Sequence, residues 1–234
     1  MGLKESGLRG SLRNVSVGID AIPDSEDLHY GWLMDEGTGS TFTDYAQDEE
    51  ASLSGGTWID GDWPGNWAIE FDGAGDYATI ENIPIDTDEP LTLEISFRAY
   101  DLTRDEHQTI INRGGSFTTN TVYDFRIFPE GPIQVSAGES LDISNYVTEG
   151  QKSLLHIVHS GPSSSEIDVY VDGDLVGSID AGDATSDHDR IAWSTNDTDD
   201  IRRHFDGDIG HTFEFNNELS GSEISDRWAK MPFA

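Results

Sequence analysis

Oxygen-bearing side chains that could hold a hard cation occur at two places in the sequence. One is Asp44, and the other is the loop Asp72-Gly73-Ala74-Gly75-Asp76. Calcium takes about six to eight oxygen ligands at roughly 2.3–2.6 Å, and aspartate-rich loops can supply several of them. Asp44, Asp72 and Asp76 are therefore the candidate ligands of a calcium ion. Because acidic residues are spread along the whole chain, solvated loop aspartates are the alternative interpretation.

Two tryptophans lie close together in the segment Gly61-Asp62-Trp63-Pro64-Gly65-Asn66-Trp67. Sugar rings stack on exposed indoles, so Trp63 and Trp67 form a candidate glycan-binding platform. Tryptophan also buries a large apolar area, which suits a domain core. In the alternative interpretation, Trp67 begins a core strand and Trp63 fills the edge of the domain.

Residues that carry nucleophilic or metal-dependent catalysis do not assemble in this sequence. There is no cysteine, no G-x-S-x-G turn and no phosphate-binding loop. His156 and His159 are three residues apart on a predicted strand, so they point to opposite faces and cannot share a metal. His188 lies between two aspartates, as expected of a solvated loop. We expect a protein that is not an enzyme.

The elements that position these side chains are short strands with alternating apolar residues. The clearest is 91–99, in which five apolar residues alternate with Thr92, Glu94, Ser96 and Arg98. Such alternation predicts one buried and one solvated face. Asp172-Gly173 between two such runs is typical of a hairpin turn. Similar runs occur at 28–34, 67–71, 77–81, 108–113, 123–128, 154–160, 167–171, 175–179 and 209–215.

One helix is predicted near the end of the chain. Ser220 and Glu223 have the spacing of a capping box, and Ile224 and Trp228 then fall on one helix face. Many short strands with turns between them predict an all-β, two-sheet antiparallel β-sandwich with a short C-terminal helix. We assign residues 28–234 to this domain.

Residues 1–27 are small, polar and weakly periodic, and we interpret them as an N-terminal arm. They lack the apolar run of about 7–15 residues that marks a secretion signal, and no stretch of the chain suits insertion into a membrane. We expect this arm to anchor the domain in a larger assembly of virion or cell-surface proteins. The apolar residues that would make the contact are Leu3, Leu8, Leu12, Val15, Val17 and Ile19.

The charge of the chain is strongly acidic. Forty-six acidic residues oppose 13 lysines and arginines, which gives a formal net charge of −33. Self-repulsion of this size destabilises a compact domain at ordinary ionic strength, whereas at about 1 M salt the screening length is only about 3 Å. The composition therefore predicts a surface adapted to molar salt. With no basic patch, nucleic acid is not an expected partner.

Beyond these local patterns, a series of blocks resembles the laminin G-like (concanavalin A-like) jelly-roll family, in a haloarchaeal or haloarchaeal-virus form. No single block is specific, but they occur in the family's order and spacing. The resemblance implies two antiparallel sheets packed face to face, with ligand sites at loop rims or on the concave sheet, and it implies no particular ligand. The blocks are 35–40 (DEGTGS), 51–58, 68–73, 76–77, 91–98, 110–114 (IINRG), 156–158, 170–173 (YVDG), 207–209 and 219–224.

The chain departs from the family pattern at three places. Leu154 replaces a frequent tryptophan, and Gln47-Asp48-Glu49-Glu50 replaces a Gly- and Asn-rich stretch. Gly210-His211 stands where an acidic pair often occurs, which weakens a transfer of calcium binding from the family.

Glycoside hydrolases on the same fold carry two glutamates on one strand, about 5–5.5 Å apart in the retaining enzymes. Here Glu166 and Asp168 match the first two acids of that motif, but Val169, Tyr170 and Val171 occupy the positions of the second glutamate. The resemblance therefore does not extend to hydrolysis.

Together these observations predict a non-catalytic structural or binding protein of a halophilic assembly. The favoured hypothesis is a homo-oligomeric virion surface protein (a capsid turret, decoration or fibre component) of a haloarchaeal virus, in contact with host glycans. The alternative is a cell-surface or secreted carbohydrate-binding module of a halophilic archaeon. Asn14 and Asn196 lie in glycosylation sequons, which matter only in a glycosylating compartment.

Overall fold

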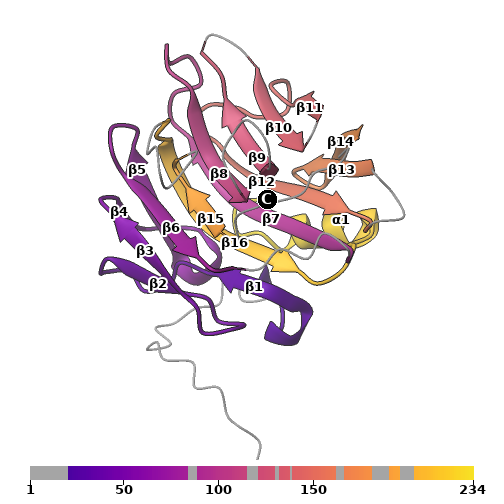
Figure 1. The fold of residues 1–234 in the computed structure, drawn as a ribbon, viewed down its shortest axis with the longest axis horizontal. Coiled ribbons are helices and arrows are strands. Elements are labelled where there is room, and N and C mark those ends of the chain that lie inside the picture. The colour runs from indigo at the N-terminus through magenta and orange to yellow at the C-terminus, as the bar shows by residue number, and fades with distance from the viewer. Residues whose placement is uncertain are drawn as a thin grey trace, which may run out of the picture.

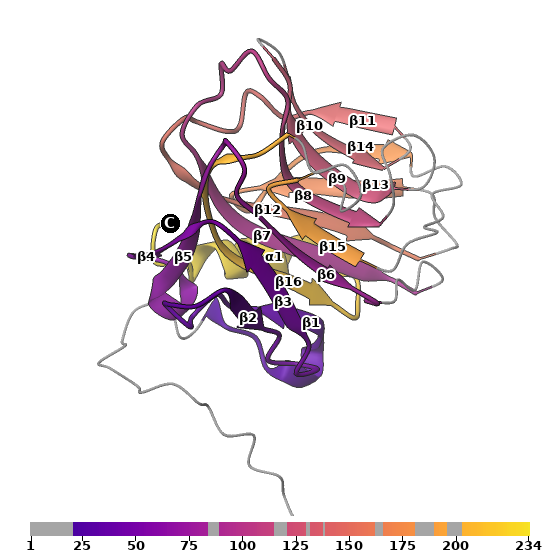
Figure 2. The same ribbon diagram turned by 60° about the vertical axis from the view of Figure 1, so that its left-hand side comes forward.

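The computed structural model describes residues 21–83, 89–114, 121–129, 132–137, 139–161, 166–180, 190–195 and 203–234. In these residues, two antiparallel sheets, each of eight strands, face each other across one core, and a single α-helix lies on the outside (Figure 1). Figure 2 shows the two sheets as separate layers. This architecture confirms the predicted β-sandwich with a C-terminal helix.

The first sheet, sheet A, has β7 (Leu91–Ala99) and β16 (Asp206–Phe215) at its centre. Strand β1 (Leu28–Trp32) pairs with β16 but stands outside the continuous order of the other seven strands. In order across the sheet, its strands are β14 (Asp174–Asp180), β13 (Glu166–Val171), β12 (Lys152–His159), β7 (Leu91–Ala99), β16 (Asp206–Phe215), β5 (Trp67–Asp72) and β4 (Thr57–Asp60), with β1 (Leu28–Trp32) as the eighth.

The second sheet, sheet B, carries β8 and β15 at its centre. Its order is β11 (Glu139–Asp142), β10 (Ile133–Ala137), β9 (Thr121–Ile127), β8 (Gln108–Gly114), β15 (Arg190–Trp193), β6 (Tyr77–Glu81), β3 (Glu50–Ser54) and β2 (Thr41–Thr43). Two short 3-10 turns, η2 (Ser25–Asp27) and η3 (Pro64–Asn66), precede β1 and β5.

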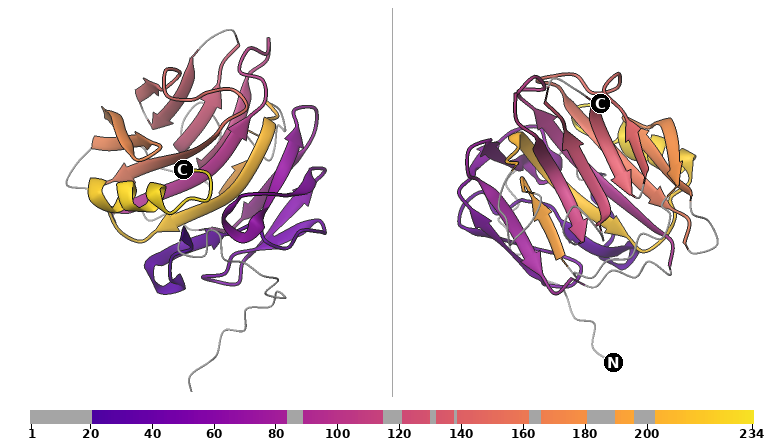
Figure 3. Two further views of the ribbon diagram at one scale, coloured as in Figure 1. Left: turned by 180° about the vertical axis from the view of Figure 1, so that it is seen from behind. Right: turned by 45° about the horizontal axis from the view of Figure 1, so that its top comes forward.

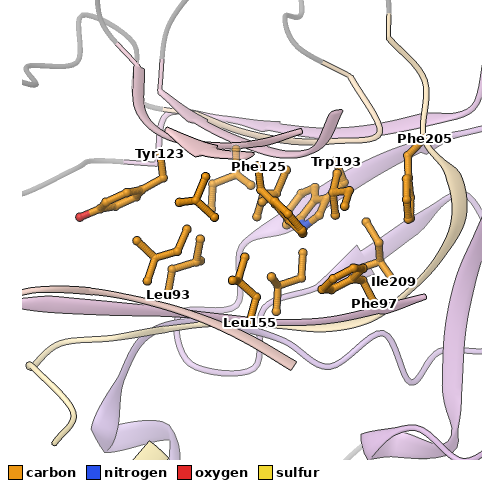
Figure 4. Close-up of a cluster of buried hydrophobic side chains, with 14 of the residues drawn as sticks. Leu93, Phe97, Tyr123, Phe125, Leu155, Trp193, Phe205 and Ile209 are labelled. Carbon is orange, nitrogen blue, oxygen red and sulfur yellow. The ribbon is translucent and has the colours of Figure 1, made fainter. Parts of the chain in front are cut away.

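The core is built by the inward-facing side chains that strand alternation predicts. Figure 4 shows Leu93, Leu155 and Ile209 of sheet A facing Phe125 and Trp193 of sheet B. Burial of each such side chain contributes about 1.5–3 kcal/mol. Polar contacts also join the two sheets: the Trp193 indole donates a hydrogen bond to the Thr212 hydroxyl at 2.9 Å, and Arg113 Nε donates to the Glu214 carboxylate at 2.9 Å.

Local signals in the sequence correctly located the hairpin and the helix. Asp172 and Gly173 adopt positive φ angles of 53° and 87° and join β13 to β14. In helix α1 (Gly221–Ala229), the Ser220 hydroxyl accepts from the Glu223 amide, and the Glu223 carboxylate accepts from the Ser220 amide at 2.7 Å. Ile224 is buried in a cluster with Phe213 and Val158, so α1 covers the outer face of sheet A (Figure 3).

This cover changes the environment of strand β7. We predicted a solvated face for Thr92, Glu94, Ser96 and Arg98, but the first three are fully buried. The prediction was wrong because alternation reports which side of a sheet a residue faces, and not whether another element packs on that side.

The base of the predicted arm is already part of the packed domain. Ala21 is buried against Leu154 and Met231, and Ile22 packs on the cluster beneath α1. The packed unit therefore includes residues from Ala21 onward rather than from Leu28. The predicted anchor residues Leu3, Leu8, Leu12, Val15, Val17 and Ile19 lie outside the described residues, as do Asn14, His188 and Asn196.

Candidate functional site

The three aspartates predicted to bind calcium serve as local turn-forming acceptors. The buried Asp44 carboxylate accepts backbone N–H groups from Gly31, from Ala46 at 3.1 Å and from Gln47 at 2.5 Å. Asp72 accepts from the Ala74 amide at 2.8 Å, and Asp76 accepts from the Asp72 amide at 3.2 Å. Within the described ranges, no three His, Asp or Glu side chains are grouped so that they could hold a metal ion. The structure therefore does not gather Asp44, Asp72 and Asp76 into one group of side-chain ligands.

The two candidate tryptophans do not form a shared platform. Trp63 is 1% exposed and lies on the outer face of sheet A above Gly210, with Lys152 Nζ 4.5 Å and the Phe233 ring 5.5 Å from its ring. Trp67 is two residues before the core residue Ile69 on β5, so it lies on the core side of sheet A, opposite the side that carries Trp63. Packing, rather than sugar stacking, describes Trp63 in this structure.

Four polar side chains lie next to one another on the outer face of sheet B: Thr109, Asn112, Asp124 and Arg126. We call them the β8–β9 polar cluster. Thr109 is paired with Arg126, and Asn112 with Asp124. A register shift after Thr109 brings Thr109 and Asn112 to one face, although residues three apart in a regular strand point to opposite faces.

This cluster combines deep burial with incomplete hydrogen bonding. Asn112 and Thr109 have no exposed surface, and Asp124 is 1% exposed. Both Asp124 oxygens, both polar atoms of the Asn112 amide and the Thr109 hydroxyl have no well-aligned hydrogen-bond partner in the part of the chain that the structure describes. Each such group costs about 1–3 kcal/mol if it stays unsatisfied. Buried polar groups of this kind call for a specific explanation.

The electrostatics of the cluster follow from this burial. Burial raises the pKa of Asp124 to about 7, although Arg126, Arg203 and Asn112 each lower it. The Arg126 guanidinium is ion-paired with the Asp124 carboxylate, and burial lowers the pKa of Arg126 to about 10. Asp124 therefore changes its charge near neutral pH.

Aromatic side chains border the cluster at one end. The Arg126 guanidinium lies over the Phe128 ring at 5.3 Å, and the His107 and Phe128 ring centres are 4.8 Å apart. His107 and Phe128 are both half-buried. The cluster thus places a carboxylate, an amide and a hydroxyl next to a partly exposed apolar ring.

Small side chains continue this surface across the whole of sheet B. Registered neighbours form one row, which contains no large apolar residue. The row runs Thr41, Ser52, Thr79, Ala192, Asn112, Asp124, Ser136 and Ser140. The outer face of sheet A differs, because α1 and the residues around Phe233 cover it.

Sequence reasoning missed this cluster. The alternation of Asp124 and Arg126 with Tyr123, Phe125 and Ile127 did predict that both polar residues face outward. Their burial and their pairing with β8 depend on register, which the alternation does not contain. The prediction that His156 and His159 face opposite ways is confirmed: His156 is paired with the outward-facing Glu94 and His159 with the core residue Leu91.

Comparisons with known proteins agree with the fold. Residues 72–225 match the model of a family (Laminin_G_3) described as the concanavalin A-like lectin/glucanases superfamily. No curated protein matches the sequence. Among the described residues, no helix has the length and apolar composition needed to cross a bilayer.

Similar solved structures include the binding domain of botulinum neurotoxin serotype D, with 14% identity, a TM-score of 0.66 and coverage of 88% of this chain and 52% of that one. The Trypanosoma rangeli sialidase in complex with sialic acid has 12% identity, a TM-score of 0.68 and coverage of 88% and 33%. The receptor binding domain of the botulinum neurotoxin C/D mosaic has 15% identity, a TM-score of 0.65 and coverage of 88% and 51%. The chain thus spans about half or a third of these structures, and at this identity the likeness concerns the fold alone.

Proposed function

Because the chain belongs to the concanavalin A-like lectin/glucanase superfamily, we propose that it is a non-catalytic carbohydrate-binding domain whose ligand meets the outer face of sheet B. The β8–β9 polar cluster carries this proposal, since among the described residues the side chains of Thr109, Asn112 and Asp124 are buried without well-aligned hydrogen-bond partners, beside a partly exposed ring. The resemblance to a toxin binding domain and a sialidase supports the proposal only at the level of fold.

The chemistry of the cluster suits sugar hydroxyls. A carboxylate accepts hydrogen bonds, a carboxamide both donates and accepts, and a threonine hydroxyl does either. A sugar hydroxyl also donates and accepts, so adjacent hydroxyls can satisfy Asp124 and Asn112 together when binding uncovers these buried side chains. The Phe128 ring supplies the apolar face that a small-molecule site needs next to its few polar groups.

A binding role fits the cluster better than hydrolysis does. Retaining glycosidases need two carboxyl groups about 5–5.5 Å apart. Within the β8–β9 polar cluster, Asp124 is the one carboxylate, and its charge partner is Arg126.

We further propose that the domain works on the surface of a high-salt assembly, on a virion or on a cell. The net charge of −33 supports the salt adaptation. Ala21 lies on the sheet A side of the sandwich. If the residues before Ala21 anchor the domain in the assembly, sheet B faces away from the anchor and toward a ligand.

The test is a glycan screen in about 3 M KCl, followed by titration calorimetry of wild type, Asp124→Asn, Asn112→Ala and Phe128→Ala. We expect loss of the Asp124 or Asn112 contact to weaken binding by at least about tenfold, as loss of one charge-assisted hydrogen bond does. Asp168→Asn on the outer face of sheet A is the matched control, since Asp168 accepts one hydrogen bond from Ser178 at 2.5 Å.

Wild-type protein that binds no glycan in the screen would contradict the function. Binding that is equally strong in all four proteins would contradict the site.

A further inference from the structure

The outer face of sheet A contains a second buried polar group, centred on Glu94. We call Glu94, Ser96, His156, His211 and Arg227 the Glu94 network. His156 Nε2 lies 2.7 Å from Glu94 Oε2, and His211 Nε2 lies 2.7 Å from Glu94 Oε1. Arg227 donates to both oxygens, from Nε and, at 2.7 Å, from Nη2. Each carboxylate oxygen therefore meets two donors.

The proton positions in the network follow from these contacts. Although burial raises it, the pKa of Glu94 is lowered well below its usual value by Arg227 and His156, so the carboxylate is ionised and only accepts. Both histidines therefore carry a proton on Nε2. On the other side of its ring, His211 Nδ1 lies 2.6 Å from the Ser96 hydroxyl, which can donate to it when the imidazole is neutral.

The network fastens two separate segments to sheet A. Arg227 belongs to α1, and its Nη2 also donates to the Ala21 carbonyl at 3.1 Å. Glu94, His156 and His211 belong to β7, β12 and β16. The polar contacts that join helix α1 and the chain around Ala21 to the sheet thus meet at one carboxylate, in addition to the apolar packing of Ile224 and Ala21.

We propose that the Glu94 network is an acid-sensitive attachment: protonation of His211 releases α1, together with the segment around Ala21, from the outer face of sheet A. A proton on Nδ1 turns this atom from an acceptor into a donor, so the Ser96 hydroxyl must reorient. It also places a new positive charge in a site without solvent, next to Arg227.

The groups that face His211 oppose this charge on balance. Burial lowers the pKa of His211, and Arg227 and His156 lower it further, while Glu94 raises it. Arg227 also faces Tyr45, and Asp24 lies in the same surroundings.

After release, His211 is solvated and its pKa returns toward about 6.5. Because the attached state has the lower pKa, attachment is complete above about pH 6.5 and weakens as the pH falls below it.

Hydrogen exchange measured on the full chain in about 3 M KCl between pH 5 and 8 tests the proposal. We expect the protection of α1 amides, corrected for intrinsic exchange, to fall by up to about tenfold per pH unit below 6.5, which corresponds to one proton taken up. Strand β8 is the internal reference and should keep its protection. The variant His211→Gln keeps a donor for Glu94 but cannot gain a proton, so its α1 protection should not depend on pH.

His204→Gln is the control variant, since His204 bonds to the Asp76 carbonyl and should leave the wild-type pH dependence intact. Constant protection of α1 across this pH range would overturn the proposal, and so would a parallel loss in β8. If His211→Gln does not fold, the NMR titration of the wild-type His211 ring decides, because a midpoint above 6.5 contradicts the proposed sign.

Discussion

The two sheets carry buried carboxylates in matching positions but in different states. Glu94 lies on the outer face of a central strand of sheet A, and Asp124 on the outer face of sheet B, each with an arginine beside it. Yet the pKa of Glu94 is lowered well below its usual range, while the pKa of Asp124 is raised to about 7.

The number of hydrogen-bond donors explains this difference. Burial acts on both carboxylates in the same direction and favours the neutral acid. Glu94 compensates for its burial with donors from His156, His211 and Arg227, whereas neither Asp124 oxygen has a well-aligned donor among the described residues. We infer that the first arrangement stabilises the fold and that the second is suited to an external ligand.

The largest expected effect is that of Glu94→Gln. The amide removes the charge partner of Arg227 and turns an N–H group toward donors, so we expect a loss of about 3–5 kcal/mol in the free energy of unfolding. Denaturant unfolding in about 3 M KCl measures this loss. Asp168→Asn, on the same face of sheet A, should change stability by less than about 0.5 kcal/mol. Equal effects of the two substitutions would remove the distinction between the Glu94 network and an ordinary surface contact.

A smaller and pH-dependent effect is expected for Asp124→Asn. The pKa of Asp124 is about 7 in the folded state and lower in the unfolded state, so between these values the unfolded state loses this proton and the folded state keeps it. Asp124 therefore lowers the free energy of unfolding as the pH rises from about 4 through 7. We expect Asp124→Asn to remove this dependence of the free energy of unfolding on pH. The variant should be more stable than wild type by on the order of 2 kcal/mol at pH 8. Unfolding curves at pH 5 and pH 8 measure it. A variant that is less stable than wild type at pH 8 would show that the carboxylate is satisfied in the fold, as Glu94 is.

The smallest expected effect concerns salt. Raising KCl from about 0.1 to 3 M should stabilise the wild type, because it screens the surface acids. Buried ion pairs are screened much less. The difference in the free energy of unfolding between wild type and Glu94→Gln should therefore change by less than about 0.5 kcal/mol over this range. A difference that disappears at high salt would mean that solvent reaches the network.

The sequence predicted the architecture because strand alternation, the Asp172-Gly173 turn and the Ser220 capping box are local signals. It did not predict the two polar clusters, because their contacts join distant parts of the chain. Arg227 reaches Glu94 across 133 positions, and Lys152 reaches the carbonyl of Asp62, next to Trp63, across 90. Glu94 and Asp124 therefore had the pattern of solvated strand residues, and Trp63 had that of a candidate ligand platform.

The cluster of Ala21, Leu154 and Met231 has a mechanical consequence. The chain enters and leaves the sandwich on one side, so a tether through the residues before Ala21 would pull on the sheet A side. Force applied there would act directly on the Arg227–Ala21 contact and helix α1, whereas strands β8 and β9 belong to the other layer. A ligand held on sheet B would be pulled from the opposite side, so the force between tether and ligand would pass through both sheets.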